Sequence, residues 1–182
     1  LYSFAYNIGT IFQVIANSLD TAWTQWFFDQ MKEEKYSTIQ KMADIYCGLV
    51  SLGAIALMLI SPELIIFLGG VKYKESIAVT FPVLLAMYYA YMYNFPSSIE
   101  YYYKKTNLIA IGTMMAAGVN ILLNAIFIPQ YGFIAAAYTT VFCYLLYYFL
   151  HILFSGKIQK NAIYNIKHQI YFLLIVTGSM FL

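Results

Sequence analysis

The sequence predicts an all-α protein, a polytopic membrane helix bundle with five complete transmembrane helices and a sixth that is cut short. Of its 182 residues, 62% are hydrophobic and only 10% are charged, against roughly 25% charged residues in ordinary soluble domains. Apolar stretches long enough to cross a bilayer recur along the chain, separated by short polar breaks. These stretches neither alternate nor stop after about ten residues, which disfavours a membrane β-barrel.

The six predicted helices are residues 2–28, 43–60, 77–103, 108–128, 133–154 and 169–182. The last one offers about thirteen residues, roughly 20 Å of helix where a bilayer core needs about 30 Å. The chain also begins at Leu1 and not at Met. We therefore expect residues 1–182 to be a membrane domain taken from a larger protein.

Two segments depart from a simple pattern of helices and loops. The break at residues 61–76 contains Pro62, a short apolar piece at 64–68 and then two glycines, so we expect it to lie along the outer face of the membrane. The stretch 77–103 is long and contains Pro82 and Pro96. Since proline removes a helical hydrogen bond, we expect this helix to be kinked and tilted.

The lysines predict the orientation in the membrane. The predicted loops 29–42, 104–107 and 155–168 carry eight of the ten lysines, and Lys72 and Lys74 account for the other two. Cytoplasmic loops of membrane proteins are enriched in Lys and Arg. The three lysine-rich loops are therefore expected in the cytoplasm.

A polar stripe runs along the first predicted helix and contains the candidate cavity residues. Its members recur at alternating spacings of four and three, and at about 100° per residue they share an arc of roughly 80°. An aspartate within a membrane helix costs about 2.5–3.5 kcal/mol at the bilayer centre, so such a stripe should face protein or a water-filled cavity. The stripe consists of Tyr6, Thr10, Gln13, Asn17, Asp20 and Thr24, opposite the lipid-like Ile8, Ile11, Phe12, Ile15 and Leu19.

Asn120 and Asn124 lie one turn apart on the fourth predicted helix, beside small residues. Asn side chains bond across helix interfaces, and small residues let membrane helices approach closely. We expect both asparagines to serve helix packing, with a cavity role as the alternative. The short break at residues 129–132 makes the fourth and fifth helices a hairpin.

Other polar residues have simpler predicted roles. Most of the nineteen tyrosines are expected as anchors at the membrane interface, although Tyr88, Tyr89, Tyr91 and Tyr93 surround the middle of the bent helix and could stack on a sugar. Glu100 and Lys104 have the spacing of a surface ion pair. His151 and His168 are expected at the membrane boundary.

Several function classes are disfavoured by the sequence. A net charge of +2 is too small for a nucleic-acid binder. Cys47 and Cys143 lie in apolar runs without metal-ligand spacing, which indicates buried free thiols. No phosphate-binding glycine loop or nucleophile–base pair is recognisable. We therefore expect no enzyme activity, no cofactor and no bound metal.

The order of several short strings resembles bacterial polysaccharide-transport flippases, the O-antigen and capsular polysaccharide exporters. These belong to the superfamily that also holds multidrug and toxic-compound extrusion (MATE) proteins and lipid II flippases, and the resemblance covers nearly the whole chain as a C-terminal half. The strings are Tyr2-Ser3-Phe4-Ala5-Tyr6, Ala22-Trp23-Thr24-Gln25-Trp26-Phe27, Ser61-Pro62-Glu63, Leu68-Gly69-Gly70-Val71-Lys72-Tyr73, Tyr103-Lys104-Lys105-Thr106, Asn120-Ile121-Leu122-Leu123-Asn124 and Ile128-Pro129-Gln130-Tyr131-Gly132.

The resemblance implies a MATE-like, two-lobed transporter of the bacterial inner membrane that works by alternating access. Its substrate would be a polyprenyl-diphosphate-linked oligosaccharide, and it would act together with glycosyltransferases and a polymerase. This chain would supply the second lobe. Two alternatives remain open: a drug or metabolite cation antiporter of the same superfamily, and a membrane-embedded enzyme or polymerase of glycan assembly. The short predicted outer loops disfavour the enzyme.

Overall fold

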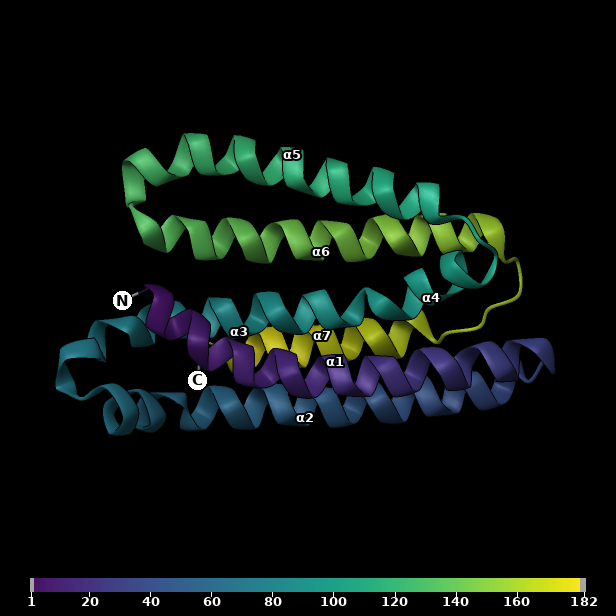
Figure 1. Ribbon diagram of the computed structural model, residues 1–182, viewed down its shortest axis with the longest axis horizontal. Coiled ribbons are helices and arrows are strands. Elements are labelled where there is room, and N and C mark those ends of the chain that lie inside the picture. The colour runs from purple at the N-terminus through teal and green to yellow at the C-terminus, as the bar shows by residue number, and fades with distance from the viewer. Residues whose placement is uncertain (1, 181–182) are drawn as a thin grey trace.

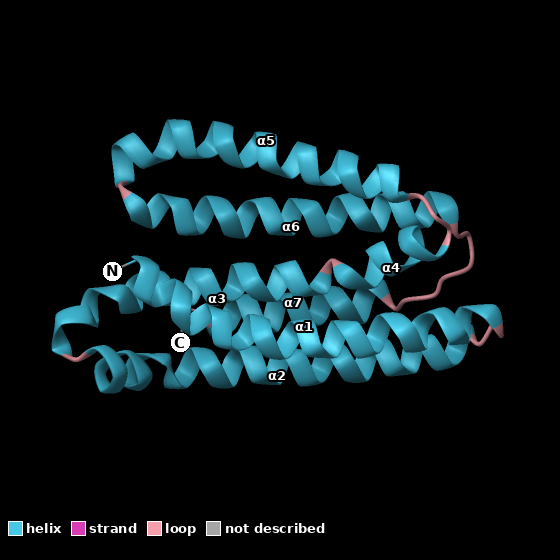
Figure 2. Cartoon of the chain, in the orientation of Figure 1, coloured by secondary structure: helices cyan, strands magenta, loops and turns pink. Residues whose placement is uncertain are grey.

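The computed structural model describes residues 2–180, and every regular element in this range is a helix (Figures 1 and 2). The expected all-α fold is therefore confirmed. Residues 181–182 of the sixth predicted helix lie outside the described part of the chain. The elements are α1 (Tyr2–Lys32), α2 (Tyr36–Gly69), the 3-10 helix η1 (Val71–Ser76), α3 (Ile77–Met92), α4 (Asn94–Tyr102), α5 (Thr106–Tyr131), α6 (Phe133–Ile158) and α7 (Ile166–Ser179).

The helices form two units that lie side by side (Figure 1). The first, called the bundle here, contains α1, α2, α3, α4 and α7. The second is the hairpin of α5 and α6, and its helix α6 packs against α3 and α4. Helix α5 contacts mainly α6 and α4, so α6 alone forms most of the contact between the two units.

Helix α3 lies at the centre of the molecule, and almost all of its side chains from Val79 to Met92 are buried. Such an all-round apolar helix is typical of the interior of a large helical protein. The core continues at one end around Trp23 of α1, which is 1% exposed and packs against Phe95 and other aromatic rings. Cys47 and Cys143 are buried and free, as the sequence predicts.

Helix α1 is divided into three faces. One face packs into the bundle core and includes Ile8 and Phe12, which the sequence places among the lipid-facing residues, so this assignment is wrong for these two. A second face carries Ile11 and Ile15, which are 44% and 58% exposed. The polar stripe lies between these two faces, because its positions are about 100° from the buried ones.

Helix α2 does not end at the predicted residue 60, because it continues through Pro62 to Gly69. Pro62 cannot donate to the carbonyl of Met58, four residues earlier. The buried hydroxyl of Ser61 donates to that same carbonyl at 2.9 Å and replaces the missing bond. The helix ends at Gly70, where φ is +73°, a backbone conformation that glycine adopts without strain.

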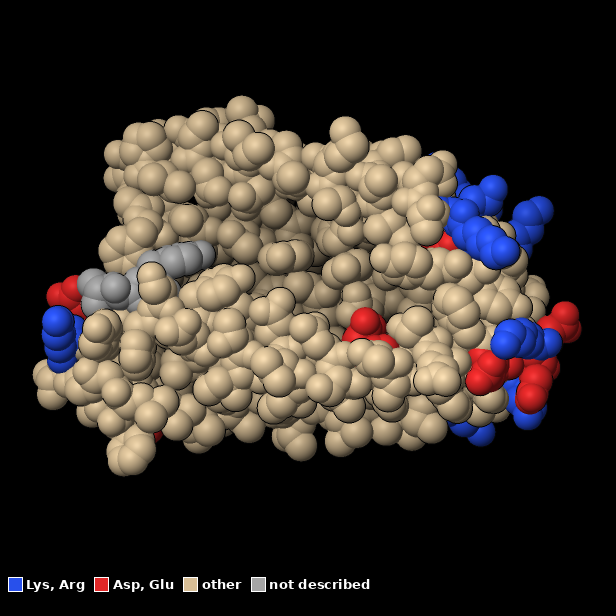
Figure 3. Space-filling model, in the orientation of Figure 1, with Lys and Arg blue, Asp and Glu red and all other residues tan. Residues whose placement is uncertain are grey.

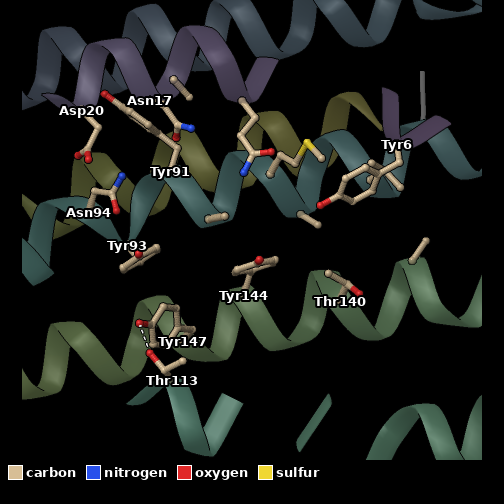
Figure 4. Close-up of a pocket in the computed structure, with 17 residues that line it drawn as sticks. Tyr6, Asn17, Asp20, Tyr91, Tyr93, Asn94, Thr113, Thr140, Tyr144 and Tyr147 are labelled. Atoms are coloured by element: carbon tan, nitrogen blue, oxygen red, sulfur yellow. Dashed lines mark hydrogen bonds between the residues drawn. The ribbon is translucent and has the colours of Figure 1, made fainter. Parts of the chain in front are cut away.

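The stretch expected to be one kinked helix is divided at Tyr93 into α3 and α4. Pro96 lies in the first turn of α4 and has no N–H for the carbonyl of Met92. The hydroxyl of Ser98 donates to the carbonyl of Asn94 at 2.7 Å. Next to this break, Tyr93 projects toward α6 and the Asn94 side chain lies beside Asp20 of α1 (Figure 4).

The expected hairpin is present, with a single residue between α5 and α6. That residue is Gly132, whose φ is +67° and whose N–H donates to the carbonyl of Ile128 at 2.8 Å. A glycine in the left-handed region is the usual way to end a helix. Helices α5 and α6 therefore run antiparallel along their whole length (Figure 1).

Four helical segments are long and apolar enough to cross a membrane, and together they indicate a membrane-embedded protein. They are Tyr36–Gly69, Val71–Tyr102, Thr106–Tyr131 and Phe133–Ile158. Helix α1 has 31 residues and is long enough to cross a membrane. It is not among these four segments, because the polar residues of its stripe lower its mean hydropathy. Lysines gather at one end of the molecule, with only Lys72 and Lys74 at the other (Figure 3).

Candidate functional site

A cavity of about 440 Å³ lies between the bundle and the hairpin, within the recess seen in Figure 3. Helices α1 and α3 form one wall, α6 forms the other, and α5 adds Thr113 (Figure 4). Its volume lies within the usual range of ligand pockets. The lining residues are Tyr6, Gln13, Ala16, Asn17, Asp20, Val83, Ala86, Met87, Ala90, Tyr91, Tyr93, Asn94, Thr113, Ala137, Thr140, Tyr144 and Tyr147.

Four members of the polar stripe on α1 line this cavity: Tyr6, Gln13, Asn17 and Asp20. Tyr6 lies toward one end and Asp20 toward the other (Figure 4). The other two stripe members, Thr10 and Thr24, are not part of the lining. The Thr10 hydroxyl donates to the backbone carbonyl of Asn7 at 2.6 Å, so it is used within the helix itself.

The tyrosines at the middle of the bent helix divide into two pairs. Tyr91 and Tyr93 line the cavity. Tyr88 instead forms a hydrogen bond of 2.7 Å with Ser51 of α2, and Tyr89 one of 2.5 Å with Thr177 of α7. The second pair therefore fastens α3 to its neighbours within the bundle and is not available to a ligand.

The opposite wall, on α6, was missed at the sequence level. Thr140, Tyr144 and Tyr147 project into the cavity from this helix (Figure 4). Their spacings of four and three place them on one helical face, and this polar face within an apolar helix is the signal that could have identified them. The Tyr147 ring lies 4.5 Å from that of Tyr93, between centroids, and its hydroxyl is 2.8 Å from that of Thr113.

Asp20 is the only charged residue in the lining formed by the described residues. It is partly buried, and the side chain of Asn94 lies beside its carboxylate (Figure 4). The rest of the polar lining consists of amides, hydroxyls and tyrosine rings. This chemistry suits a ligand that offers hydroxyl groups and C–H faces more than one that carries a strong negative charge.

Asn120 and Asn124 lie in the interface between α5 and α6. Asn124 donates from Nδ2 to Oδ1 of Asn120 at 2.9 Å and accepts a bond of 2.5 Å from the Thr139 hydroxyl. Asn120 also lines a smaller recess of about 240 Å³, which shares Thr113, Thr140, Tyr144 and Tyr147 with the main cavity. Neither asparagine lines the main cavity, and their contacts are those of helix packing.

The surface ion pair expected between Glu100 and Lys104 is wrong, because Glu100 contacts His151 instead. Both side chains are fully buried and contact each other, with Nδ1 of His151 2.7 Å from Oε1 of Glu100. The other histidine, His168, is exposed and lies 2.8 Å from Asp44. Both pairings join residues distant in sequence, and local spacing carries no signal for them.

These features define a helical membrane protein with a polar, tyrosine-rich cavity between two helical units. A scan against protein-family models and searches of curated proteins and of solved structures give no match to the chain.

Proposed function

We propose that this chain belongs to a transporter that moves lipid-linked oligosaccharide across the bacterial inner membrane by alternating access. One observation carries the proposal: a cavity lined by amides, hydroxyls and tyrosine rings lies between two units of an otherwise apolar helical protein. In hydrocarbon, such polar groups are costly unless they face a partner or water. A hydrophilic solute passing through the membrane is the partner that this lining fits.

The lining suits a glycan for three reasons. Gln13, Asn17 and Thr140 offer donors and acceptors to sugar hydroxyls. Tyr93, Tyr144 and other tyrosines offer aromatic faces to the C–H groups of a pyranose. The volume of about 440 Å³ accommodates sugar units and leaves no room for a long lipid. The polyprenyl chain would therefore stay in the bilayer beside the protein.

The diphosphate of such a substrate does not fit this cavity, because Asp20 is the only charged lining residue among those described. A carboxylate in a low-dielectric cavity repels a second anion. The diphosphate would instead remain at the membrane surface or meet cations on another part of the transporter. By the lysine distribution, loops 29–42, 104–107 and 155–168 would face the cytoplasm.

Movement of the hairpin relative to the bundle would open the cavity to one side and then to the other. Transporters commonly rock one group of helices against another around a central site. Here the site lies between α1 and α3 of the bundle and α6 of the hairpin. The resemblance to polysaccharide flippases supports this assignment and makes the chain the second lobe of a two-lobed transporter.

A second candidate, export of organic cations, is favoured by one observation. Asp20 lies in a cavity whose walls include Tyr91, Tyr93 and Tyr144. A carboxylate surrounded by aromatic faces attracts a cation through charge and through cation–π contacts. The two functions differ in what Asp20 contributes, and this difference can be measured.

Water access to the cavity provides the first test. Gln13→Cys and Asn17→Cys, in a protein whose two native cysteines are replaced by alanine, should react with a membrane-impermeant maleimide in liposomes. Ile15→Cys is the matched control, because Ile15 is 58% exposed on the same helix but should face lipid. Failure of both stripe positions to react in any conformer, or equal reaction of all three, contradicts the proposal.

Transport provides the second test. The full-length transporter in proteoliposomes should translocate a fluorescent polyprenyl-diphosphate-linked sugar. Tyr144→Ala should slow this about two- to tenfold, from the loss of one aromatic contact worth about 0.5–1.5 kcal/mol. Tyr138→Ala, on the same helix but outside the cavity lining, should leave the rate unchanged. Export of organic cations without any sugar translocation would support the second candidate instead.

A further inference from the structure

The buried pair of Glu100 and His151 joins the two units of the molecule. Glu100 belongs to α4 of the bundle and His151 to α6 of the hairpin, and both side chains have no solvent exposure. Their 2.7 Å contact is a side-chain hydrogen bond from α6 to the bundle. Another such bond joins Tyr148 of α6 to Gln169 of α7 at 2.7 Å. The pair is thus part of the interface between the two units.

The second atom of each group has no hydrogen-bond partner. Oε2 of Glu100 and Nε2 of His151 are both buried and unpaired within the described part of the chain. An unpaired buried polar atom costs about 1–3 kcal/mol, and more when it is charged. A pair required only for packing would be expected to satisfy these atoms or to be replaced by apolar residues. The two unpaired atoms point to a role in which the pair changes its protonation.

The proton balance of the pair follows from its geometry. With a carboxylate and a neutral imidazole, the Nδ1–H of His151 donates to Oε1 of Glu100, and the pair carries a charge of −1. One proton taken from water onto Nε2 gives an imidazolium beside a carboxylate, with no net charge. Because an uncompensated charge in a buried site is strongly unfavourable, the protonated pair suits the closed interface and the deprotonated pair favours the entry of water.

The surroundings of the pair connect it to the cavity. The ring of Tyr147 lies 4.4 Å and that of Tyr93 5.6 Å from the imidazole, between centroids, and both tyrosines line the cavity. From α5, the backbone at Gly112 packs so closely that a Cβ there would lie 2.9 Å from Nε2 of His151. Tyr93 and Tyr147 therefore separate the imidazole from the cavity, and α5 covers Nε2.

Few other titratable groups face the pair. Tyr93 and Tyr147 are in ring contact with His151. Tyr101 and Tyr144 act electrostatically on both of these tyrosines, and Asp20 acts on Tyr93. Helix α5 contributes Gly112 and no ionisable contact among the described residues. No lysine forms an ion pair with Glu100 in the range 2–180, so the pair supplies its own charge compensation.

We propose that Glu100 and His151 form a proton-binding site that holds the hairpin against the bundle. Binding of one proton at Nε2 neutralises the pair and keeps α6 closed on α4. Release of that proton to cavity water leaves a buried negative charge, which is relieved when α6 separates from α4 and water enters. Proton occupancy thus controls the width of the cavity. The identity of the transported solute does not enter this inference, although the movement would serve the proposed transport.

The chain contains a matched control for this site. His168 and Asp44 form the same kind of contact, Nδ1 to Oδ2 at 2.8 Å, but the imidazole is 58% exposed. The chain has only these two histidines. Within residues 1–182, His168→Gln therefore leaves only His151 and His151→Gln leaves only His168. Each ¹⁵N NMR signal of the histidine-labelled full-length protein in lipid nanodiscs can then be assigned by its loss in the matching variant.

The test uses the full chain without any substrate. In the His168→Gln protein, the imidazole nitrogens of His151 should bind and release one proton reversibly, and adding Glu100→Gln should change this response, because the hydrogen-bonded charge beside the ring is lost. In the His151→Gln protein, Asp44→Asn should change the proton affinity of His168 far less, since solvent screens that pair. Absence of a titration of His151 in the folded protein, or no effect of Glu100→Gln, overturns the proposal.

The movement is tested by spin-label distances between α6 and α2, with labels at Phe149→Cys and Leu49→Cys in a background whose native cysteines are alanine. Both positions are exposed. The distance should increase as pH rises through the titration of His151 and should no longer respond to pH in His151→Gln. If the distance between the two labels does not depend on pH in protein that retains Glu100 and His151, control of cavity width by this pair is refuted. This result can be obtained even if Glu100→Gln fails to fold. Loss of sugar transport alone would not affect these readouts.

Discussion

Replacement of Asp20 by asparagine distinguishes the two candidate solutes. Asp20 is the only charged residue in the described cavity lining, and Asn94 lies beside it. A cation bound about 5 Å from the carboxylate, at an effective dielectric constant of ~20, would gain about 3 kcal/mol from this charge. Its loss would weaken cation binding by roughly a hundredfold or more.

A neutral glycan should respond far less to Asp20→Asn. Asparagine keeps an acceptor oxygen of similar size and adds donor groups, so the change is limited to the strength of one hydrogen bond, about 1 kcal/mol or roughly fivefold. We expect this small effect for a lipid-linked sugar.

Binding of both ligand types to the full-length transporter in nanodiscs, measured by calorimetry, provides the assay. The same protein with Asn17→Asp is a useful counterpart, because it adds a carboxylate to the lining one turn away. It should strengthen binding of an organic cation and leave a neutral oligosaccharide nearly unchanged. A loss of sugar binding by a hundredfold in Asp20→Asn, or cation binding that responds to neither substitution, would refute this reasoning.

Three further outcomes concern stability. Gly132→Ala should lower the free energy of unfolding by about 1 kcal/mol, since φ is +67° at this residue. Gly118→Ala should not, because a Cβ there meets open space within a helix. Equal effects of the two substitutions in chemical unfolding would contradict the backbone argument. Thr139→Val should cost about 0.6–1.7 kcal/mol by removing the bond to Asn124, and no change in the same assay would contradict it. Burial raises the pKa of Tyr164 well above its usual range. The phenol therefore loses its proton first in the unfolded state, and the free energy of unfolding should fall as pH rises past about 10. Tyr164→Phe should reduce this loss of stability, and an unchanged pH profile of stability in this variant would contradict the prediction.

Periodicity accounts for the part of the site that could be predicted. The stripe on α1 depends only on helical spacing, and four of its members line the cavity. The same reasoning applied to α6 would have singled out Thr140, Tyr144 and Tyr147, since their spacing is equally regular. That stripe contains no charged residue, so its cost in a membrane is smaller and its signal is weaker.

The amino-acid sequence by itself determined the helical membrane class, the hairpin and the polar face of α1, because composition and helical spacing are local properties. Only the tertiary structure decided which faces meet. It placed Tyr88 and Tyr89 on neighbouring helices and removed Glu100 from its apparent partner at Lys104. It placed Glu100 next to His151, 51 residues away in the sequence, because a buried charged group requires a hydrogen-bonded partner and helix packing determines which residue lies close enough.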